Sequence, residues 1–345
     1  MKTILCTLYN SLYLDKGLVL YDSLCGCAKD FKLYVLCMDD KCYEVLKDLK
    51  QEHHIPVRLS DFEKGDAALL EAKGNRPMSE YCWTCSSSFI RFVLKRYGEE
   101  CCTYIDADMY FYDDPRVLID EMLDARKSVM VVPHRFSEDK KRLAATVGTY
   151  CVEFNTFLNA PESLEVLEYW RRRCLECCSN IGDGIHWGDQ KYLEELVDRY
   201  KCVYVCQNPG AGVAPWNISL YHAIEDTETG MAYKPMKQRV SVKFYHYQGL
   251  TYITRKKVST AIDANRMNID YVLVDHLYRH YLMCIDKKKQ WLSDRYGINI
   301  LIKSHPSAKW VTRIKMLLRN TLVSQMLRRL CRPVKGAGQY CISIE

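Results

Sequence analysis

The first fifty residues alternate between strand and helix patterns, and this alternation limits the possible folds more than any other feature of the sequence. Short apolar strands are predicted at residues 4–9 and 31–37, and amphipathic helices at residues 12–25 and 40–51. Because short links join these segments, the strands should lie parallel in one sheet with helices on its faces. We therefore predict an α/β fold with a mostly parallel central sheet, whose ligands bind at the carboxyl ends of the strands.

Two carboxylates follow a further short strand. Residues 103–105 are β-branched or aromatic, and Asp106 and Asp108 come directly after them. Side chains two residues apart in an extended chain point the same way, so both carboxylates can face one hard cation such as Mg²⁺ or Mn²⁺. Acidic pairs are also common in solvated turns, so the pattern predicts a metal site only when other residues support it.

A histidine later in the chain gives that support. His246 ends a predicted strand at residues 240–245, and Gly249 follows three residues on. A lone histidine is usually a core residue, but one at a strand end, in a chain with an earlier Asp-x-Asp, is predicted to be a metal ligand. Neutral imidazole suits Mn²⁺ better than Mg²⁺.

The chain resembles the glycosyltransferases of the GT-A fold, in particular the family-8 type and related bacterial nucleotide-diphospho-sugar transferases. The likeness covers about residues 3–250 and rests on the strand-helix alternation, Asp106-Ala107-Asp108, Asp189-Gln190 and His246-Tyr247-Gln248-Gly249. It implies a transferase that moves a sugar from a nucleotide-diphosphate sugar to a hydroxyl acceptor, with retained anomeric configuration. It also implies that Asp106, Asp108 and His246 hold Mn²⁺ or Mg²⁺ against the donor diphosphate.

The resemblance also implies roles for other residues in donor binding. Thr7 and Tyr9, at the end of the first strand, are expected to meet the nucleoside, although Tyr9 could instead only cover the sheet, and Gly249 is expected to lie against the donor. Asp189 and Gln190 are expected beside the anomeric centre, as catalytic residues. Asp189 has an alternative role as the N-cap of a helix predicted at residues 191–200, because aspartate is a favoured capping residue.

The chain departs from the resembled pattern at two places. An Asn-x-Gly element that touches the donor sugar is replaced by Cys151 and Glu153, so Glu153 either takes part in the chemistry, binds a sugar hydroxyl or is a structural polar residue. The helix predicted at residues 80–96 has no cation before Arg91 to reach the donor phosphates. Arg76, in a loop predicted at residues 60–80, is the substitute we consider.

Other residues are candidates for substrate binding. Trp216 lies in a Gly- and Pro-rich loop of the kind that presents an aromatic ring to a sugar, and we assign it to the acceptor side. Asn155 and His186 are further candidates. His134 and Arg135 are expected either at a ligand-facing strand end or in a solvated loop.

The chain has 18 cysteines, which raises the question of zinc or disulfides. Cys82 and Cys85 could join Cys174, Cys177 and Cys178 in a thiolate site. The long separation of the two groups, and the helical pattern around the second, argue against zinc. Free cysteines that act as small hydrophobic residues are the expected state in a reducing cytosol.

The positive charge is concentrated near the C-terminus. Residues 295–345 hold ten Lys or Arg and one acid, Glu345, whereas the whole chain has a formal charge of only +6. Trp310 and a row of Ile, Leu and Val accompany these cations at helical spacing. We predict that residues 309–332 bind an anionic membrane surface. A nucleic acid would not require the apolar stripe, and packing of the stripe on the enzyme or on a second subunit is the alternative.

These observations predict a catalytic domain at residues 1–260, a packed helical extension at 261–300 and a basic helical tail at 301–345. No run approaches the ~20 apolar residues that a membrane-spanning helix needs. We expect a cytoplasmic protein on the inner face of the membrane that acts on a saccharide or glycolipid acceptor in bacterial surface polysaccharide or glycolipid assembly. A nucleotidyltransferase, or a non-catalytic sugar-nucleotide or membrane-binding protein of the same fold, remains an alternative.

Overall fold

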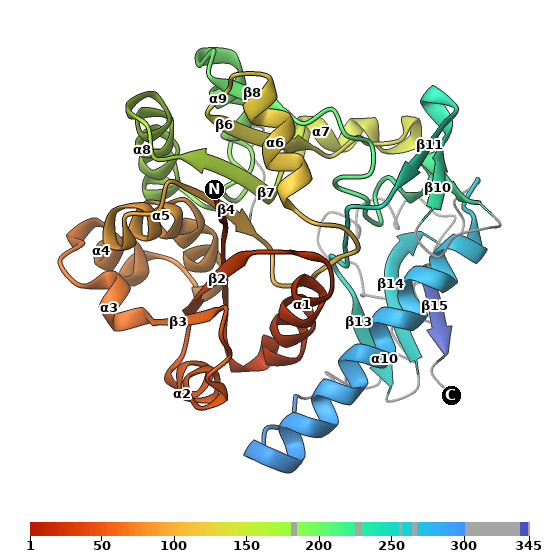
Figure 1. Cartoon of the computed structure of the whole chain (residues 1–345), viewed down its shortest axis with the longest axis horizontal. Helices are drawn as coiled ribbons and strands as arrows, with labels where there is room; N and C mark the ends of the chain where they lie inside the picture. The colour runs from red at the N-terminus through yellow and green to blue at the C-terminus, as the bar shows by residue number, and fades with distance from the viewer. Residues whose placement is uncertain (181–184, 225–229, 255–256, 264–267, 301–338, 344–345) are drawn as a thin grey trace, which may run out of the picture.

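A seven-stranded sheet forms the centre of the molecule in a computed structural model, which describes residues 1–180, 185–224, 230–254, 257–263, 268–300 and 339–343 (Figure 1). The strand order is β3-β2-β1-β4-β7-β6-β8, and β7 alone runs antiparallel to its neighbours among these seven strands. The strands are β1 (Thr3–Tyr9), β2 (Phe31–Cys37), β3 (His54–Arg58), β4 (Cys101–Ile105), β6 (Val129–Pro133), β7 (Tyr150–Leu158) and β8 (Val203–Val205). The predicted α/β fold class is confirmed.

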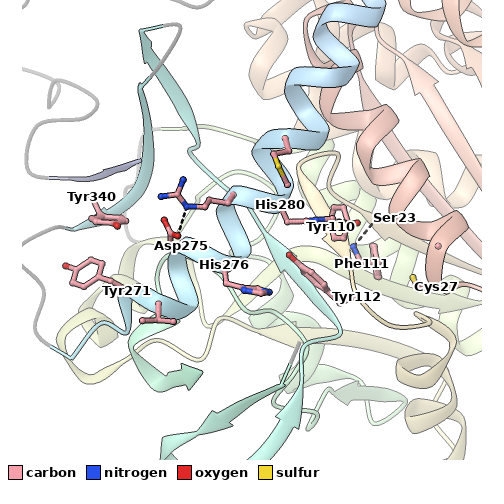
Figure 2. A pocket seen from close by; sticks show the side chains of 14 residues that line it. Ser23, Cys27, Tyr110, Phe111, Tyr112, Tyr271, Asp275, His276, His280 and Tyr340 are labelled. Carbon is pink, nitrogen blue, oxygen red and sulfur yellow. Dashed lines mark hydrogen bonds and ion pairs between the residues drawn. The ribbon is translucent and has the colours of Figure 1, made fainter. Parts of the chain in front are cut away.

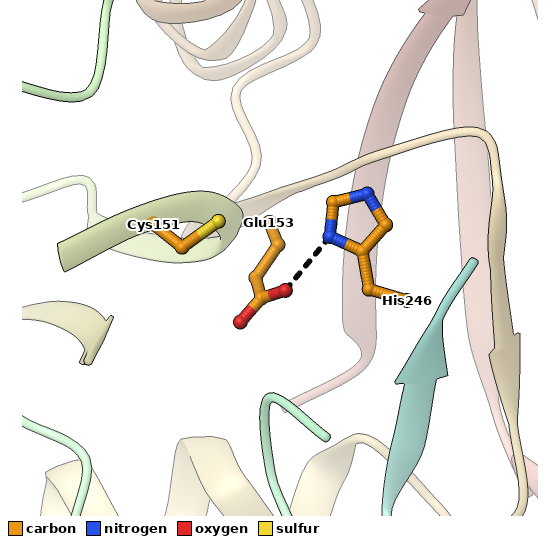
Figure 3. Close-up of side chains that lie close together, drawn as sticks. All are labelled: Cys151, Glu153 and His246. Carbon is orange, nitrogen blue, oxygen red and sulfur yellow. Dashed lines mark hydrogen bonds and ion pairs between the residues drawn. The ribbon is translucent and has the colours of Figure 1, made fainter. Parts of the chain in front are cut away.

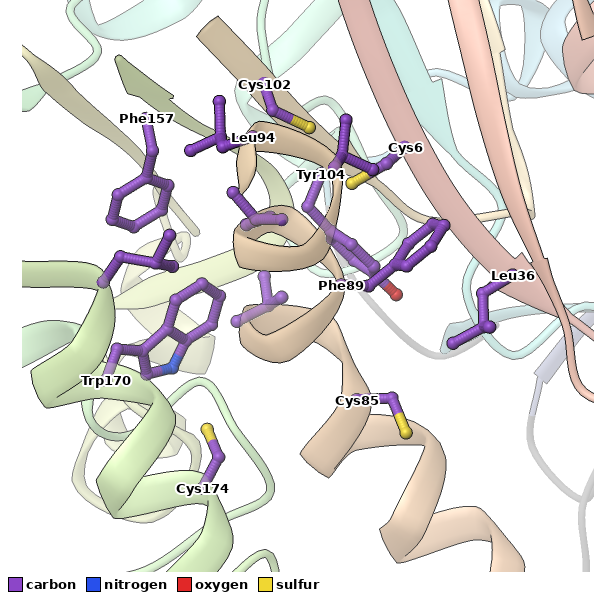
Figure 4. Close-up of a cluster of buried hydrophobic side chains, with 14 of the residues drawn as sticks. Cys6, Leu36, Cys85, Phe89, Leu94, Cys102, Tyr104, Phe157, Trp170 and Cys174 are labelled. Carbon is purple, nitrogen blue, oxygen red and sulfur yellow. The ribbon is translucent and has the colours of Figure 1, made fainter. Parts of the chain in front are cut away.

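Helices cover both faces of this sheet because its strands are apolar on both sides. Ile4 and Leu5 illustrate this, since they enter different cores. One core contains α5 (Met78–Tyr97), α8 (Pro161–Glu176) and α9 (Leu193–Arg199), with Trp170 and Phe157 stacked at its centre (Figure 4). The other contains α1 (Leu14–Cys27), α2 (Asp40–Leu49) and α6 (Arg116–Asp124).

A two-stranded ribbon beside the sheet joins distant parts of the chain. β5 (Met109–Phe111) directly follows the Asp-x-Asp and pairs antiparallel with β12 (Phe244–His246). His246 lies opposite Met109 in this pairing, and the Tyr247 amide donates to the Asp108 carbonyl over 2.9 Å. The ribbon therefore carries His246 to the end of β4.

A third core lies around the long helix α10 (Tyr271–Tyr296), which packs along α1. It is rich in tyrosine, and the rings of Tyr247 and Tyr281 stack with centroids 3.7 Å apart. Two small sheets complete the described chain: β9 (Tyr221–Ala223), β10 (Gly230–Tyr233) and β11 (Gln238–Ser241), and then β13 (Thr251–Thr254), β14 (Lys257–Asp263) and β15 (Gln339–Ser343).

Residues 60–80 differ from the predicted loop, because they contain parts of three helices. These are α3 (Leu59–Glu63), α4 (Ala67–Asn75) and the start of α5 at Met78. Asp66 caps α4 by accepting from the Leu69 amide, and Leu69 and Ala72 are buried. The glycines that suggested a loop mark the ends of short helices instead.

The C-terminal region also differs from the predicted all-helical tail. β15 pairs with β14, and Ile342 is buried against the third core, so a strand follows the basic segment. β14 spans residue 260, where the first domain was predicted to end. The predicted membrane-binding segment, residues 309–332, lies outside the described residues. Within the described residues, no helix is long and apolar enough to cross a membrane.

Candidate metal and donor site

Three predicted metal ligands meet beside the carboxyl end of β4. Asp106 and Asp108 lie in the turn between β4 and β5, and His246 arrives on β12. His246 Nε2 is 3.1 Å from Asp108 Oδ1 and 3.6 Å from Asp106 Oδ2. One ligand atom from each of the three lies within 4.8 Å of the others. Two carboxylates and an imidazole form a donor set that fits Mn²⁺, and both carboxylates are partly exposed, which leaves an open side for a ligand.

The charges at this site depend strongly on one another. Burial raises the pKa of Asp106 to about 8, against the attraction of His246. Burial also acts to raise the pKa of Asp108, but His246 outweighs it and lowers that pKa to about 2. Burial acts to lower the pKa of His246, yet Asp108 and further hydrogen bonds raise it well above its usual value. In the metal-free protein, His246 therefore carries a proton that a metal must displace.

A further carboxylate contacts the other nitrogen of the same imidazole. Glu153, on β7, has no exposed surface, and its Oε2 lies 2.8 Å from His246 Nδ1 (Figure 3). Cys151 lies on the same strand, and Cys151, Glu153 and His246 form a second group whose ligand atoms lie within 4.8 Å of one another. Glu153 is thus held beside the metal group and is shielded from solvent.

Asp189 lies near the metal group and does not cap a helix. Its Oδ2 accepts from Ser86 Oγ over 2.6 Å, and its carbonyl accepts from Trp170 Nε1 over 2.9 Å. The helix α9 starts at Leu193, with Tyr192 in the N-cap position, so the N-cap alternative for Asp189 is wrong. Burial raises the pKa of Asp189 to about 7, although the hydrogen bond from Ser86 opposes this.

The residues predicted at the end of β1 are both buried. Thr7 Oγ1 has no hydrogen-bond partner among the described residues. The Tyr9 ring packs on Gly17, where an added Cβ would lie 2.3 Å from the ring, and its hydroxyl is 3.4 Å from His54 Nε2. Tyr9 is 3% exposed and its ring belongs to the core beneath α1.

Two residues on the first turns of the following helices were missed by the sequence analysis. Tyr13 is 43% exposed, and the Lys16 ammonium lies 4.1 Å from the centre of its ring. Burial acts to lower the pKa of Lys16, but the attraction of Asp108, together with smaller effects of Tyr13 and Asp15, outweighs burial and raises that pKa. Lys16 is therefore a cation next to the metal group. In the sequence, Lys16 could have been identified from its place three residues after a tyrosine, at the start of the helix that follows β1.

The two arginines that were considered near a ligand, Arg76 and Arg135, donate hydrogen bonds to backbone carbonyls. Arg76 donates to the Cys174 and Leu175 carbonyls near the end of α8, and Arg135 donates to the Cys206 and Ala211 carbonyls. Arg76 thereby joins the α4–α5 connection to α8. Its partners lie far along the chain, so the sequence offered no sign of this role.

Trp216 lies against His246. Its Nε1 donates to the His134 carbonyl over 2.9 Å, and its ring meets the His246 ring edge to face at 5.5 Å. The Trp216 ring therefore limits the movement of the His246 ring. Burial lowers the pKa of His134 to about 4, so the imidazole beside Trp216 is neutral.

The remaining predicted residues have varied surroundings. Asn155 is buried, and neither polar atom of its side chain has a partner among the described residues. Gln190 Nε2 donates to the Val147 carbonyl over 2.7 Å. His186 meets the Tyr192 ring edge to face at 6.1 Å. Gly249 has a φ of +76°, and a Cβ there would lie 2.9 Å from Ala261 Cβ, which explains glycine at this position.

The cysteines considered as a zinc site are divided between core and rim. Cys85, Cys174 and Cys178 are buried in the core beneath α5 and α8, whereas Cys82 and Cys177 are half-buried. Neither of the two metal-capable groups found in the described part of the chain includes any of them.

An open groove of about 910 Å³ lies between α1, β5 and α10 (Figure 2). None of the predicted site residues lines it. Aromatic rings dominate its lining, which comprises Ser23, Gly26, Cys27, Tyr110, Phe111, Tyr112, Tyr271, Val272, Asp275, His276, Arg279, His280, Met283 and Tyr340.

Two Bacillus subtilis (strain 168) proteins are similar in sequence to this chain. "Uncharacterized protein YfnD" is 32% identical over 254 residues, which cover 73% of this chain and 79% of that protein. "Uncharacterized protein YfnF" is 28% identical over 304 residues, or 86% of this chain and 97% of that protein. No family model matches the chain.

Solved structures of glycosyltransferases are also similar. Apo mouse xyloside xylosyltransferase 1 has a TM-score of 0.46 at 14% identity, and the match covers 72% of this chain and 98% of that one. Galactosyltransferase LgtC, in complex with donor and acceptor sugar analogs, has a TM-score of 0.46 at 13% identity, with 83% and 96% covered.

The raised pKa of Asp189 predicts a pH-dependent gain in stability for Asp189→Asn. Wild-type Asp189 ionises near its ordinary pKa of 3.8 when unfolded but only near about 7 when folded. The stability provided by its neutral form is therefore present below about pH 4 and is lost as the pH rises to about 7. Asparagine has no such loss, so the variant should gain about 1–4 kcal/mol at about pH 8 and much less at about pH 5. Urea unfolding at both pH values measures this gain. An equal difference in unfolding free energy between variant and wild type at the two pH values would contradict the prediction.

The raised pKa values of Asp106 and His246 predict that metal affinity increases with pH. Below about pH 8, a metal must displace protons from both groups. The Kd for Mn²⁺ should therefore fall by about tenfold per pH unit for each proton released, as the pH rises from about 6 to about 8. Calorimetry in two buffers of different ionisation enthalpy counts the released protons. A flat profile with no proton release would be the opposing result.

Proposed function

The chain belongs to the family of the Bacillus subtilis protein YfnD and has the glycosyltransferase-like GT-A fold, and from this premise we propose that it is a metal-dependent glycosyltransferase. Its substrate would be a nucleotide-diphosphate sugar, and a hydroxyl group of a saccharide or glycolipid would be the acceptor. The observation that carries the proposal is the meeting of Asp106, Asp108 and His246 beside the carboxyl end of β4. Three ligands with an open side match a cation that also binds a diphosphate.

The metal and Lys16 would share the donor diphosphate. A bound Mn²⁺ or Mg²⁺, held by Asp106, Asp108 and His246, would supply Lewis-acid stabilisation of the charge on the departing diphosphate. Lys16 adds a fixed positive charge beside Asp108, where its ammonium can contact a phosphate oxygen. Arg76 is not needed for this role, because its guanidinium is engaged by α8.

The nucleoside would lie beyond the end of β1. Tyr13 offers an exposed ring there, next to Lys16, on which a base can stack. Tyr9 would support this subsite from below, as part of the core under α1. The unpartnered hydroxyl of Thr7 fits a group that orders a donor or a water molecule at the strand end.

The donor sugar would lie between Asp189, Gln190 and Asn155. Asp189 is oriented by Ser86, and Asn155 holds two buried polar atoms without a partner among the described residues. Such groups can hydrogen-bond sugar hydroxyls and fix the anomeric carbon near the acceptor. We place the acceptor on the side of Trp216 and His186, and we assign the chain to a retaining hexosyl transfer in surface polysaccharide or glycolipid assembly.

Release of a nucleoside diphosphate from a panel of sugar nucleotides with Mn²⁺ tests the function. Wild-type protein should release it from one donor, and Asp108→Asn should lower turnover by at least about 100-fold, because the metal then lacks a charged ligand. Thermal unfolding of the variant checks that the fold is retained. Lys16→Met should weaken nucleotide-diphosphate binding without abolishing Mn²⁺ binding.

Different failures of this assay identify the alternatives. Donor binding without release of any product would indicate a non-catalytic sugar-nucleotide-binding protein. Release of pyrophosphate from a nucleoside triphosphate and a sugar phosphate would indicate a nucleotidyltransferase. Equal turnover of wild type and Asp108→Asn would contradict the metal assignment.

We further propose that the enzyme binds an anionic membrane surface through residues 309–332, on the cytoplasmic side. The sequence supports this by its unbalanced positive charge and by the accompanying apolar stripe. The described chain adds a constraint on how to test it. Because β15 follows this segment and pairs with β14, a truncation near Ser304 would also remove a strand of the fold. Substitution of charges is therefore the cleaner experiment.

Arg313→Glu, Lys315→Glu and Arg319→Glu, combined, should weaken co-sedimentation with anionic liposomes. Each cation near such a surface contributes about 1 kcal/mol, so the triple variant should lose ~100-fold or more in affinity. Lys41→Glu, Lys64→Glu and Lys201→Glu make the same charge change at exposed positions of the body and serve as the matched control. Equal loss in both triple variants, or binding to neutral liposomes alone, would contradict the proposal.

A further inference from the structure

Glu153 is a carboxylate buried in the centre of the site with only one of its oxygens engaged. Oε2 lies 2.8 Å from His246 Nδ1, and Oε1 has no partner among the described residues. Oε1 also lies 2.7 Å from the position that a Cβ on Gly212 would occupy. Gly212 has a φ of +73°, so both its backbone and the carboxylate beside it require glycine. The glycine at position 212 therefore leaves room for this carboxylate.

The His246 ring has a different neighbour at each nitrogen. Nδ1 faces Glu153, and Nε2 faces Asp108 at 3.1 Å and Asp106 at 3.6 Å. An imidazole that binds a metal through Nε2 must keep its other proton on Nδ1, and an acceptor at Nδ1 fixes that tautomer. The Trp216 ring, edge to face at 5.5 Å, restricts rotation of the imidazole. The neighbours of His246 therefore favour one ring orientation and one proton position.

We propose that Glu153 is a positioning residue, which accepts the Nδ1–H of His246 and so presents the Nε2 lone pair to the metal held with Asp106 and Asp108. This inference rests on the proposed metal-dependent function and deepens it. Glu153 acts through His246, because its Oε2 lies against Nδ1 of that ring. It also makes the imidazole a more basic ligand, because a carboxylate partner stabilises the positive charge that the metal induces on the ring.

A second arrangement of the same residues has to be distinguished from this one. Cys151, Glu153 and His246 could bind a cation themselves, through a thiolate, a carboxylate and Nδ1. Such a mixed set suits Zn²⁺, whereas the aspartate pair suits Mn²⁺. Glu153 Oε2 lies 2.8 Å from His246 Nδ1, which is the separation of a direct hydrogen bond between these two atoms. The geometry therefore assigns Nδ1 to the hydrogen bond with Glu153.

Mn²⁺ binding by the full-length protein, followed by the electron paramagnetic resonance of free Mn²⁺, tests the proposal without any assay of activity. Glu153→Leu removes the acceptor and should raise the Kd for Mn²⁺ by about 10–100-fold. Glu153→Gln keeps an acceptor oxygen and should fall between the wild type and Glu153→Leu. Glu63→Gln is the matched control, because Glu63 is also a buried carboxylate but is bound by Tyr81 and Lys73 away from the metal. It should leave the Kd unchanged.

Nitrogen-15 NMR of histidine-labelled wild type gives a readout that does not depend on how the variants fold. With Mg²⁺ bound, His246 should show a protonated Nδ1 and a metal-bound Nε2, assigned by its disappearance in His246→Gln. A metal on Nδ1, or equal Mn²⁺ affinity of Glu153→Leu and wild type, would overturn the proposal. If wild type binds no divalent metal, the proposed function fails as well. If wild type binds Mn²⁺ and Glu153→Leu binds it equally, only the role of Glu153 fails.

Discussion

The pairing of β5 with β12 is the interaction on which the site depends. It brings His246 opposite Met109, although the two residues are far apart in sequence, and it ties the Tyr247 amide to the Asp108 carbonyl. The backbone hydrogen bonds of this short ribbon set the distance between the aspartates and the imidazole. The large sheet fixes the other side, because β4 and β7 hold Asp106 and Glu153 from neighbouring strands. A site assembled in this way requires the whole α/β fold.

This arrangement concentrates buried negative charge. The charges of Asp108, Asp189 and Glu153 all act to raise the pKa of Asp106, and His246 is the cation that opposes them. Like charges held together in a site of low polarity destabilise a folded protein unless a counter-ion binds. Such strain is common where a fold is shaped to bind a ligand, and it is consistent with a site that is completed by a divalent cation.

Strands and helices that follow local sequence patterns were predicted well from the sequence. Apolar strands such as Phe31–Cys37 and amphipathic helices such as α1 depend on local patterns, and the meeting of Asp106, Asp108 and His246 was predicted from their places at strand ends. Residues whose roles depend on distant partners were not predictable. The carbonyls at the end of α8 that engage Arg76, and the imidazole nitrogen that engages Glu153, lie about a hundred residues away along the chain. The packing of Tyr9 against Gly17 is likewise a tertiary property, which no local pattern indicates.

Because of the strand β15, the basic segment before it is not the end of the folded chain. Pairing of β15 with β14, and burial of Ile342, fasten the chain again after residue 338. The segment between α10 and β15 is therefore attached to the folded chain at both ends, and a partner bound to it must lie near both. A protease that cut the chain between α10 and β15 would leave the last strand attached only by its backbone hydrogen bonds and its apolar contacts. The C-terminal fragment would then behave as a ligand of the rest of the folded chain, with an occupancy that depends on its concentration.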